Sequence, residues 1–286
     1  MSVALCYYHS ICILHTSFPN FPTTGVGSCN HCTFTFGSSF ISLLFCTQYL
    51  SSNNVINIMG GPSINDKFPN LIGSTQDTDS FDLYDYLQDS WGVVFMHPGD
   101  YTPVCTTELG EAAKRKEEFA KRNVKLCGFS CNNGDSHKGW IEDIKHVCKL
   151  DTFDYPIFCD PNRDKAVELG IIDASNKDAQ GLPLTVRSVY ILKPDKSIAL
   201  MMTYPASTGR NFDEIIRVID SLQLTAKQSL ATPVNWKPGD ECIVNFPLTD
   251  AQADEMFGKY GYRIEDVPSE KGKDLPKHYL RWTKAT

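Results

Sequence analysis

Residues 91–108 read WGVVFMHPGDYTPVCTTE, and the order of residue types in this stretch predicts a strand, a loop and a helix. The apolar run at 91–96 is typical of a buried strand, and apolar positions at helical spacing within 109–123 predict an amphipathic helix. Thr102 is expected to cap the helix by accepting from a free N–H. Pro103 would then occupy the first helical position, where no N–H is needed.

Cys105 falls in the first turn of this predicted helix. The N–H groups of a first turn have no partner within the helix, so they favour negative charge nearby. The thiolate is the reactive form of cysteine, and this position therefore indicates a nucleophile. From the local pattern alone an alternative stays open, because most free cysteines are small buried apolar residues.

The rest of the chain alternates expected strands and helices. Strands are predicted at 67–71, 124–130 and 155–159, with a hairpin of 186–192 and 198–204; helices are predicted at 135–150, 164–170 and 212–224, and a short helix or loop at 81–87. This alternation predicts an α/β sheet covered by helices. After about residue 225, short runs punctuated by proline and glycine indicate a smaller carboxy-terminal domain.

Several blocks resemble the one-cysteine (1-Cys) subfamily of the peroxiredoxins, which are AhpC/TSA thiol peroxidases with a thioredoxin-like fold. Pro98-x-x-x-Thr102-x-x-Cys105 matches their active-site motif, and the resemblance covers roughly residues 63–286. Further similar blocks lie at 119–126, 177–183, 204–214, 221–225 and 231–236. The resemblance implies a thioredoxin-like domain at 62–225 and a carboxy-terminal peroxiredoxin domain at 226–286.

The resemblance also implies a role for each of seven residues. Cys105 would be the peroxidatic cysteine, whose thiolate attacks a peroxide and becomes a sulfenic acid. The other six would surround it: Thr102 as a hydrogen-bond partner of thiolate and peroxide, Arg187 as the fixed cation, Glu108 and Arg210 as the network holding Arg187, Pro98 as a shield against water, and His97 beside the pocket. Without the resemblance, Arg187 would be interpreted as a solvated arginine at a strand end.

The oxidised Cys105 must be reduced again. Among the cysteines at 105, 127, 131, 148, 159 and 242, only Cys242 is placed to act as a late resolving partner. Its surroundings lack the Val-Cys-Pro pattern typical of two-cysteine members, so the single-cysteine mechanism is favoured. It implies no bound cofactor and an external thiol reductant, either glutathione (with or without a glutathione transferase) or thioredoxin. The resemblance further implies a homodimer.

Two other functions stay open. The protein could be a redox sensor or chaperone switched by oxidation of Cys105. Some members of the subfamily also have phospholipase A2 activity with a Gly-x-Ser-x-Gly motif, a histidine and an aspartate. Here Ser90 lacks the first glycine, Tyr84 replaces the histidine, and only Asp195 matches. A serine without its histidine base is a poor nucleophile, so lipase activity is not expected.

The charge and composition of the chain argue against several further classes of function. The net charge is −7 without a basic tract, which argues against nucleic-acid binding. Residues 1–65 contain no Asp, Glu, Lys or Arg, so they lack the basic residues of a secretory signal or a mitochondrial transit peptide. Their apolar runs are too short for a membrane span. We therefore expect a cytosolic protein without stable membrane association.

The uncharged amino-terminal segment is a separate question. Residues 1–58 precede the region of resemblance and are expected to be either a disordered extension or an artefact of gene prediction. Cys29 and Cys32 have the spacing of half a zinc site, which Cys12, His15, His31 or Cys46 would have to complete. No second close pair is present, so no metal is expected.

Overall fold

The computed structural model describes residues 60–273 and 278–285, and within residues 1–59 only the backbone of four strands. These strands form two antiparallel pairs: β1 (Ser2–Tyr8) with β2 (Ser10–Thr16), and β3 (Gly27–Cys29) with β4 (Cys32–Phe34). The chain divides into two units, Met1–Asn57 and Ile58–Thr286. The prediction of an extension or artefact at residues 1–58 and the prediction for the half zinc site fall on residues that lie, apart from these strand backbones, outside the described part of the chain, and both stay predictions.

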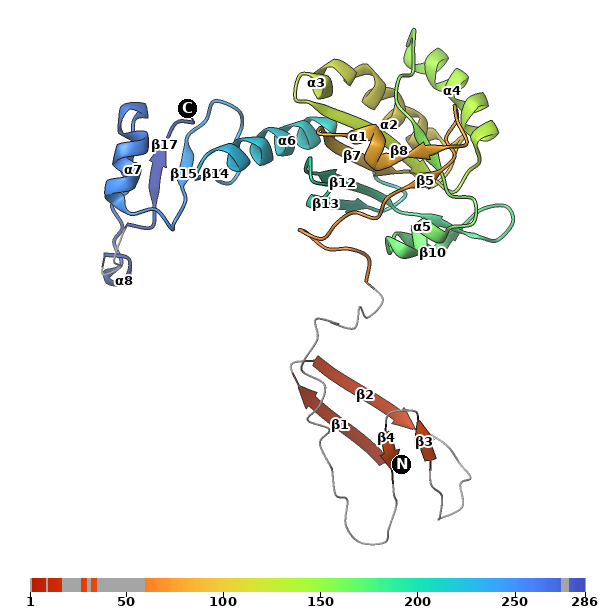
Figure 1. Cartoon of the computed structure of the whole chain (residues 1–286), viewed down its shortest axis with the longest axis horizontal. Helices are drawn as coiled ribbons and strands as arrows, with labels where there is room; N and C mark the ends of the chain where they lie inside the picture. The colour runs from red at the N-terminus through yellow and green to blue at the C-terminus, as the bar shows by residue number, and fades with distance from the viewer. Residues whose placement is uncertain are drawn as a thin grey trace. The chain divides into compact units, whose positions relative to one another are not determined.

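The second unit is built on a five-stranded sheet with the strand order β13-β12-β7-β8-β9 (Figure 1). Its strands are β7 (Trp91–Met96), β8 (Val124–Ser130), β9 (Ile157–Cys159), β12 (Arg187–Leu192) and β13 (Ile198–Tyr204). β8 runs parallel to both β7 and β9, whereas β12 is antiparallel to both β7 and β13. The strands predicted at 91–96, 124–130 and 155–159 and the predicted hairpin are confirmed, with bounds that shift by at most two residues.

Helices cover both faces of this sheet. They include α1 (Leu83–Leu87), α2 (Pro103–Lys114), α4 (Gly134–Cys148), α5 (Asp164–Glu168) and α6 (Phe212–Lys227). Successive side chains of a strand point to opposite faces. Val93 and Phe95 accordingly join a core with residues of α2, α4 and α6, while Val94 and Met96 join a second core with residues of α1 and α5. The α/β prediction is confirmed.

The single helix predicted over 109–123 is wrong in one respect, because the structure contains two helices there. α2 ends at Lys114 and α3 (Lys116–Ala120) follows, separated by Arg115 with φ −93° and ψ 11°. The apolar pattern continues through this break, since Phe119 of α3 enters the same core as α2. The apolar period of the sequence therefore gave no sign of the break between the two helices.

The strand predicted at 67–71 is also wrong. Lys67 makes only an isolated bridge to Ser197, and the regular pairing starts later, between β5 (Ile72–Gly73) and β6 (Phe81–Asp82). Pro69 has no N–H to extend a ladder, so the segment cannot continue as a strand. A second short pair, β10 (Ile172–Lys177) with β11 (Pro183–Thr185), was not predicted.

The carboxy-terminal residues form a small strand-rich region with its own core, as predicted. Four strands have the order β14 (Leu230–Ala231), β15 (Cys242–Val244), β17 (Arg281–Thr283) and β16 (Arg263–Ile264), accompanied by α7 (Asp250–Phe257), the 3₁₀ helix η1 (Gly258–Tyr260) and α8 (Glu270–Lys273). Figure 1 shows α6 leading into this region, so the predicted boundary at 225–226 falls within that helix. None of the described helices is both long and apolar enough to span a membrane.

Candidate active site

Cys105 lies in the first turn of α2, directly after the loop that leaves β7, and it is fully buried. Thr102 is the N-cap residue with extended backbone, and Pro103 opens the helix, as predicted. The predicted capping bond is wrong, however. The Thr102 hydroxyl donates to the carbonyl of Gly99 at 2.8 Å, and it makes no side-chain cap. The Thr102 hydroxyl therefore uses its proton in a hydrogen bond within the loop.

Arg187 is the cation beside the thiol. It is the first residue of β12, and its Nη1 lies 3.1 Å from the Cys105 Sγ. Its Nε and Nη2 both donate to the carbonyl of Ala206, at 2.9 and 2.7 Å, which fixes the plane of the guanidinium. Only 3% of Arg187 is exposed, so the interpretation as a solvated strand-end arginine is wrong. A buried, oriented guanidinium interacts with a charge far more strongly than a solvated one.

Glu108 and Arg210 complete a buried charge network around Arg187. Glu108 Oε2 accepts from Arg187 Nη1 at 2.7 Å and from Arg210 Nη2 at 2.8 Å, while Oε1 accepts from the backbone N–H and the Nε of Arg210. Arg210 also donates to the carbonyl of Met96, at the end of β7. Two guanidiniums and one carboxylate leave one positive charge in excess, which a thiolate at Cys105 would neutralise.

His97 and Pro98, the other two predicted site residues, are both buried in the loop between β7 and α2. The His97 Nε2 lies 2.9 Å from Asp100 Oδ1, and its ring lies 5.1 Å from the ring of Trp140. Burial lowers the pKa of His97, which keeps the imidazole neutral near pH 7. The partner of His97 Nε2 is therefore the Asp100 carboxylate.

Asp100 and His137 were missed by the sequence analysis. They join His97 in a buried cluster whose ligand-type atoms lie within 4.8 Å of one another, an arrangement with the donor set of a metal site. His137 Nδ1 and Asp100 Oδ2 are separated by only 2.7 Å, and Ser136 Oγ donates to the same oxygen at 2.6 Å. These are hydrogen-bond distances, and the outer ring nitrogens lack the partners that metal-bound histidines usually have. The cluster is best described as a hydrogen-bond network.

Three further cysteines of this domain lie in surroundings that disfavour the thiolate. Burial raises the pKa of Cys127 and of Cys131 to about 12, and that of Cys159 to about 11. Such thiols stay protonated at neutral pH and are poor nucleophiles. Cys127 and Cys159 are buried, whereas Cys131 is only partly buried.

Cys242 is the cysteine that the sequence offered as a resolving partner. It lies in β15, fully buried in the core of the carboxy-terminal region. Burial also raises the pKa of its thiol. Both observations agree with the single-cysteine mechanism.

The three residues at the phospholipase positions have separate partners. The buried Ser90 hydroxyl donates to the carbonyl of Leu87, and the Tyr84 hydroxyl donates to another backbone carbonyl. Asp195 accepts from Ser197 and pairs with Lys67. Ser90 therefore has no basic partner in these contacts, and the expectation of no lipase activity stays a prediction.

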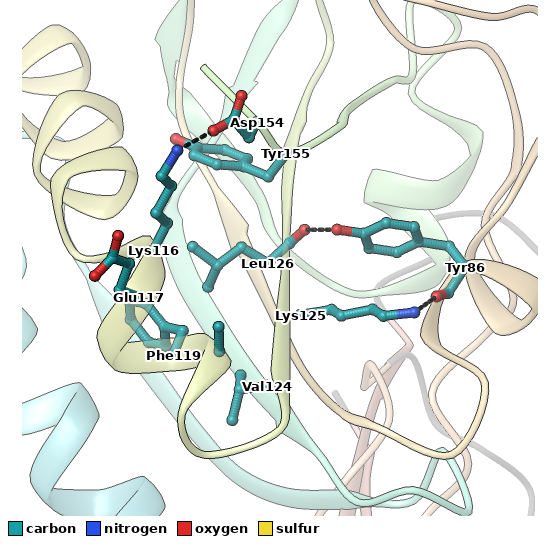
Figure 2. Close-up of a pocket in the computed structure, with 10 residues that line it drawn as sticks. Tyr86, Lys116, Glu117, Phe119, Val124, Lys125, Leu126, Asp154 and Tyr155 are labelled. Atoms are coloured by element: carbon teal, nitrogen blue, oxygen red, sulfur yellow. Dashed lines mark hydrogen bonds and ion pairs between the residues drawn. The ribbon is translucent and has the colours of Figure 1, made fainter. Parts of the chain in front are cut away.

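A separate cavity of about 320 Å³ lies among α3, the start of β8 and Tyr86 (Figure 2). Both of its lysines already have partners: Lys116 pairs with Asp154, and Lys125 donates to the carbonyl of Tyr86. The start of β8 pairs with the start of β7, whereas Cys105 follows the other end of β7. The cavity is therefore not part of the thiol site.

Comparison with known proteins agrees with the fold and shows the family. The AhpC/TSA family matches residues 64–201, and the C-terminal domain of 1-Cys peroxiredoxin matches residues 221–259. The 1-Cys peroxiredoxin of Dirofilaria immitis is 45% identical over 233 residues, covering 77% of this chain and 96% of the relative. Peroxiredoxin-6 of Bos taurus is 46% identical over 227 residues, covering 78% and 98%.

Solved structures give the same result. A cysteine-to-serine mutant of peroxiredoxin 6 from Arenicola marina aligns with a TM-score of 0.74 at 43% identity, covering 79% of this chain and 99% of that chain. These matches place the chain in the class of thiol peroxidases, which are oxidoreductases with a thioredoxin-like fold. Within that class, it belongs to the 1-Cys peroxiredoxin family.

Proposed function

We propose that Cys105 is the peroxidatic cysteine of this enzyme. The observation that carries this assignment is the buried Arg187 guanidinium, 3.1 Å from the Cys105 Sγ and held by Glu108 and Ala206. The thiolate attacks one peroxide oxygen, the O–O bond breaks, and the sulfur becomes a sulfenic acid. The leaving oxygen takes a proton and departs as water, or as an alcohol when the substrate is an organic hydroperoxide.

The surrounding residues would assist this step in different ways. Arg187 stabilises the thiolate and the charge that develops on the leaving oxygen. Because the Thr102 proton is directed to Gly99, the Thr102 oxygen would accept a hydrogen bond from the peroxide. Pro98 is buried in the same loop, where it would limit the access of water to the sulfur.

Replacing Arg187 with methionine is expected to lower the rate constant for oxidation by hydrogen peroxide about 10²–10³-fold, the usual loss when one charge-stabilising donor is removed. Arg187→Lys should recover part of the rate, since it restores the charge but not the fork of donors. Stopped-flow oxidation of the reduced protein measures both variants. A rate for Arg187→Met within threefold of wild type would contradict the assigned role.

The sulfenic acid would be reduced by an external thiol. A similar solved structure, of yeast mitochondrial 1-Cys peroxiredoxin, is described as the basis of a thiol resolving mechanism via glutathione/thioredoxin systems. We infer the same class of reductant here: one thiol forms a mixed disulfide with Cys105 and releases water, and a second thiol reduces that disulfide. Steady-state turnover with each system separately identifies the reductant. A Cys105–Cys242 crosslink after peroxide, abolished by Cys242→Ser, would instead show an internal resolving cysteine.

We also propose that the protein is a homodimer located in the cytosol. β13 is an edge strand within the described part of the chain. Only Ile198, its first residue, bonds the backbone of Asn65 and Asp66, so the rest of its outer side is available for pairing with another copy. The six described cysteines are free thiols, as a reducing compartment would keep them. For the homodimer, light scattering should give about twice the chain mass of 32.0 kDa. For the location, cell fractionation should recover the protein with cytosolic markers. A monomeric mass or an organellar location would contradict the respective proposal.

A further inference from the structure

The Asp100 carboxylate lies within hydrogen-bond distance of several side chains. It lies within hydrogen-bond distance of His97 Nε2 at 2.9 Å, His137 Nδ1 at 2.7 Å and Ser136 Oγ at 2.6 Å. Hydrogen bonds from both histidines help to hold the pKa of Asp100 well below its ordinary value, so the group is ionised at neutral pH. An ionised carboxylate can only accept, and both rings must therefore donate to it. This arrangement fixes one tautomer of each histidine.

These bonds join two different elements. His97 and Asp100 belong to the loop between β7 and α2, whereas Ser136 and His137 belong to the first turn of α4. The Asp100 backbone N–H also donates to Asn132 Oδ1 at 3.1 Å, in the segment that leads into α4. The Cys105 loop is thus tied to the start of α4 through one residue.

Trp140 of α4 adds a second tie next to the first. Its Nε1 donates to Thr106 Oγ1 at 3.1 Å, and that hydroxyl donates in turn to the carbonyl of Thr102 at 2.8 Å. Both Thr106 and Thr102 are close neighbours of Cys105 in the chain. α4 therefore contacts the Cys105 segment on both sides of the helix start.

The burial of Cys105 makes these ties relevant to the reaction. The side chain has no exposed surface, so a thiol reductant must displace part of the segment before its sulfur can reach Cys105. Hydrogen peroxide has only two heavy atoms, whereas glutathione is a tripeptide and needs a far larger opening. The oxidation step thus requires only a small opening next to Cys105, whereas the reduction step requires the loop to move aside.

On the basis of the function proposed above, we propose that Asp100 is a positioning residue that latches the Cys105 loop to α4. The closed latch keeps Cys105 beside Arg187 for the reaction with peroxide. Release of the latch lets the loop move so that an external thiol can attack the oxidised sulfur. Asp100 then sets the balance between the two half-reactions without touching either substrate.

Asp100→Asn tests the latch, because it removes the charge and replaces one of the two acceptor oxygens, each of which bonds a different histidine, with an N–H₂ group. The two half-reactions are followed separately: oxidation of the reduced protein by hydrogen peroxide, and reduction of the sulfenic acid by glutathione. A lost charged hydrogen bond shifts the loop toward the open state, so we expect reduction to accelerate about tenfold. Oxidation should not accelerate, and over-oxidation with glutathione present should decrease.

Two further variants provide a control and a second, milder test of the latch. Asp135→Asn makes the same chemical change at an exposed residue in the first turn of α4, and it should leave both rates unchanged. Ser136→Ala removes a single donor to Asp100, and it should accelerate reduction about two- to threefold, deciding the question if Asp100→Asn does not fold.

Two outcomes overturn the latch: a reduction rate that is unchanged or slower in the folded variants, or two half-reactions that change in the same direction. A wild-type protein that forms no sulfenic acid at Cys105 would instead contradict the proposed function itself.

Discussion

Replacing Cys105 with serine is expected to abolish peroxide consumption completely. The serine hydroxyl is not ionised at neutral pH and cannot form a sulfenic acid, so neither half of the cycle remains. The Arg187 guanidinium, 3.1 Å from the sulfur, would then face a neutral oxygen. The measurement is steady-state consumption of hydrogen peroxide with an excess of thiol reductant, together with mass spectrometry of residue 105.

Cys242→Ser is the matched control for this loss. Cys242 is a fully buried cysteine in the separate carboxy-terminal core, and its replacement should leave turnover unchanged. The same assay distinguishes the enzyme from a redox sensor. A single stoichiometric oxidation of Cys105 without turnover under any thiol donor would favour the sensor, and turnover that survives in Cys105→Ser would contradict the assignment.

Replacing Glu108 with glutamine is expected to destabilise the protein by about 3–5 kcal/mol, the usual cost of leaving a buried charge without its partner. Glu108 is buried and accepts from both Arg187 and Arg210, so its neutral variant leaves two guanidiniums in one buried cluster. Urea unfolding measures the change. The rate of oxidation by peroxide should decrease as well, since Arg187 loses the carboxylate that orients it.

Glu111→Gln provides the control one turn further along α2. Glu111 pairs with Arg115 at 2.6 Å, but its side chain is 38% exposed. Exposed ion pairs contribute about 0–1 kcal/mol, so the free energy of unfolding should change by less than about 1 kcal/mol. Equal effects of the two substitutions would show that burial of the Glu108 network does not stabilise the fold.

Much of the fold could be predicted because each element carries its own local pattern. The run at 91–96 is apolar at every position but one, as a strand buried on both faces requires, and the structure places its residues alternately in two cores. The errors occurred where a single residue interrupts the regular backbone within a continuous apolar pattern. Arg115 interrupts a helix whose apolar period continues, and the strand predicted at 67–71 is lost because Pro69 cannot donate to a ladder.

The active site divides in the same way. Thr102, Pro103 and Cys105 are local in sequence, so their place at a helix start was predictable, but the partner of the Thr102 hydroxyl depended on the shape of the loop. Asp100 carried only a weak signal, a polar residue in a turn three positions after a histidine. His137, 37 positions further on, carried no signal that connects it to this loop.

The sequence by itself determined where the nucleophile lies: a cysteine in the first turn of a helix that follows a buried strand. The family resemblance named residues around it, but only the tertiary structure decided how they are arranged and bonded. Arg187 is 82 positions from Cys105, and it reaches the sulfur because β12 pairs with β7 in the sheet. Electrostatic interactions depend on the distance in space and on burial, and neither quantity can be obtained from positions along a chain before it folds.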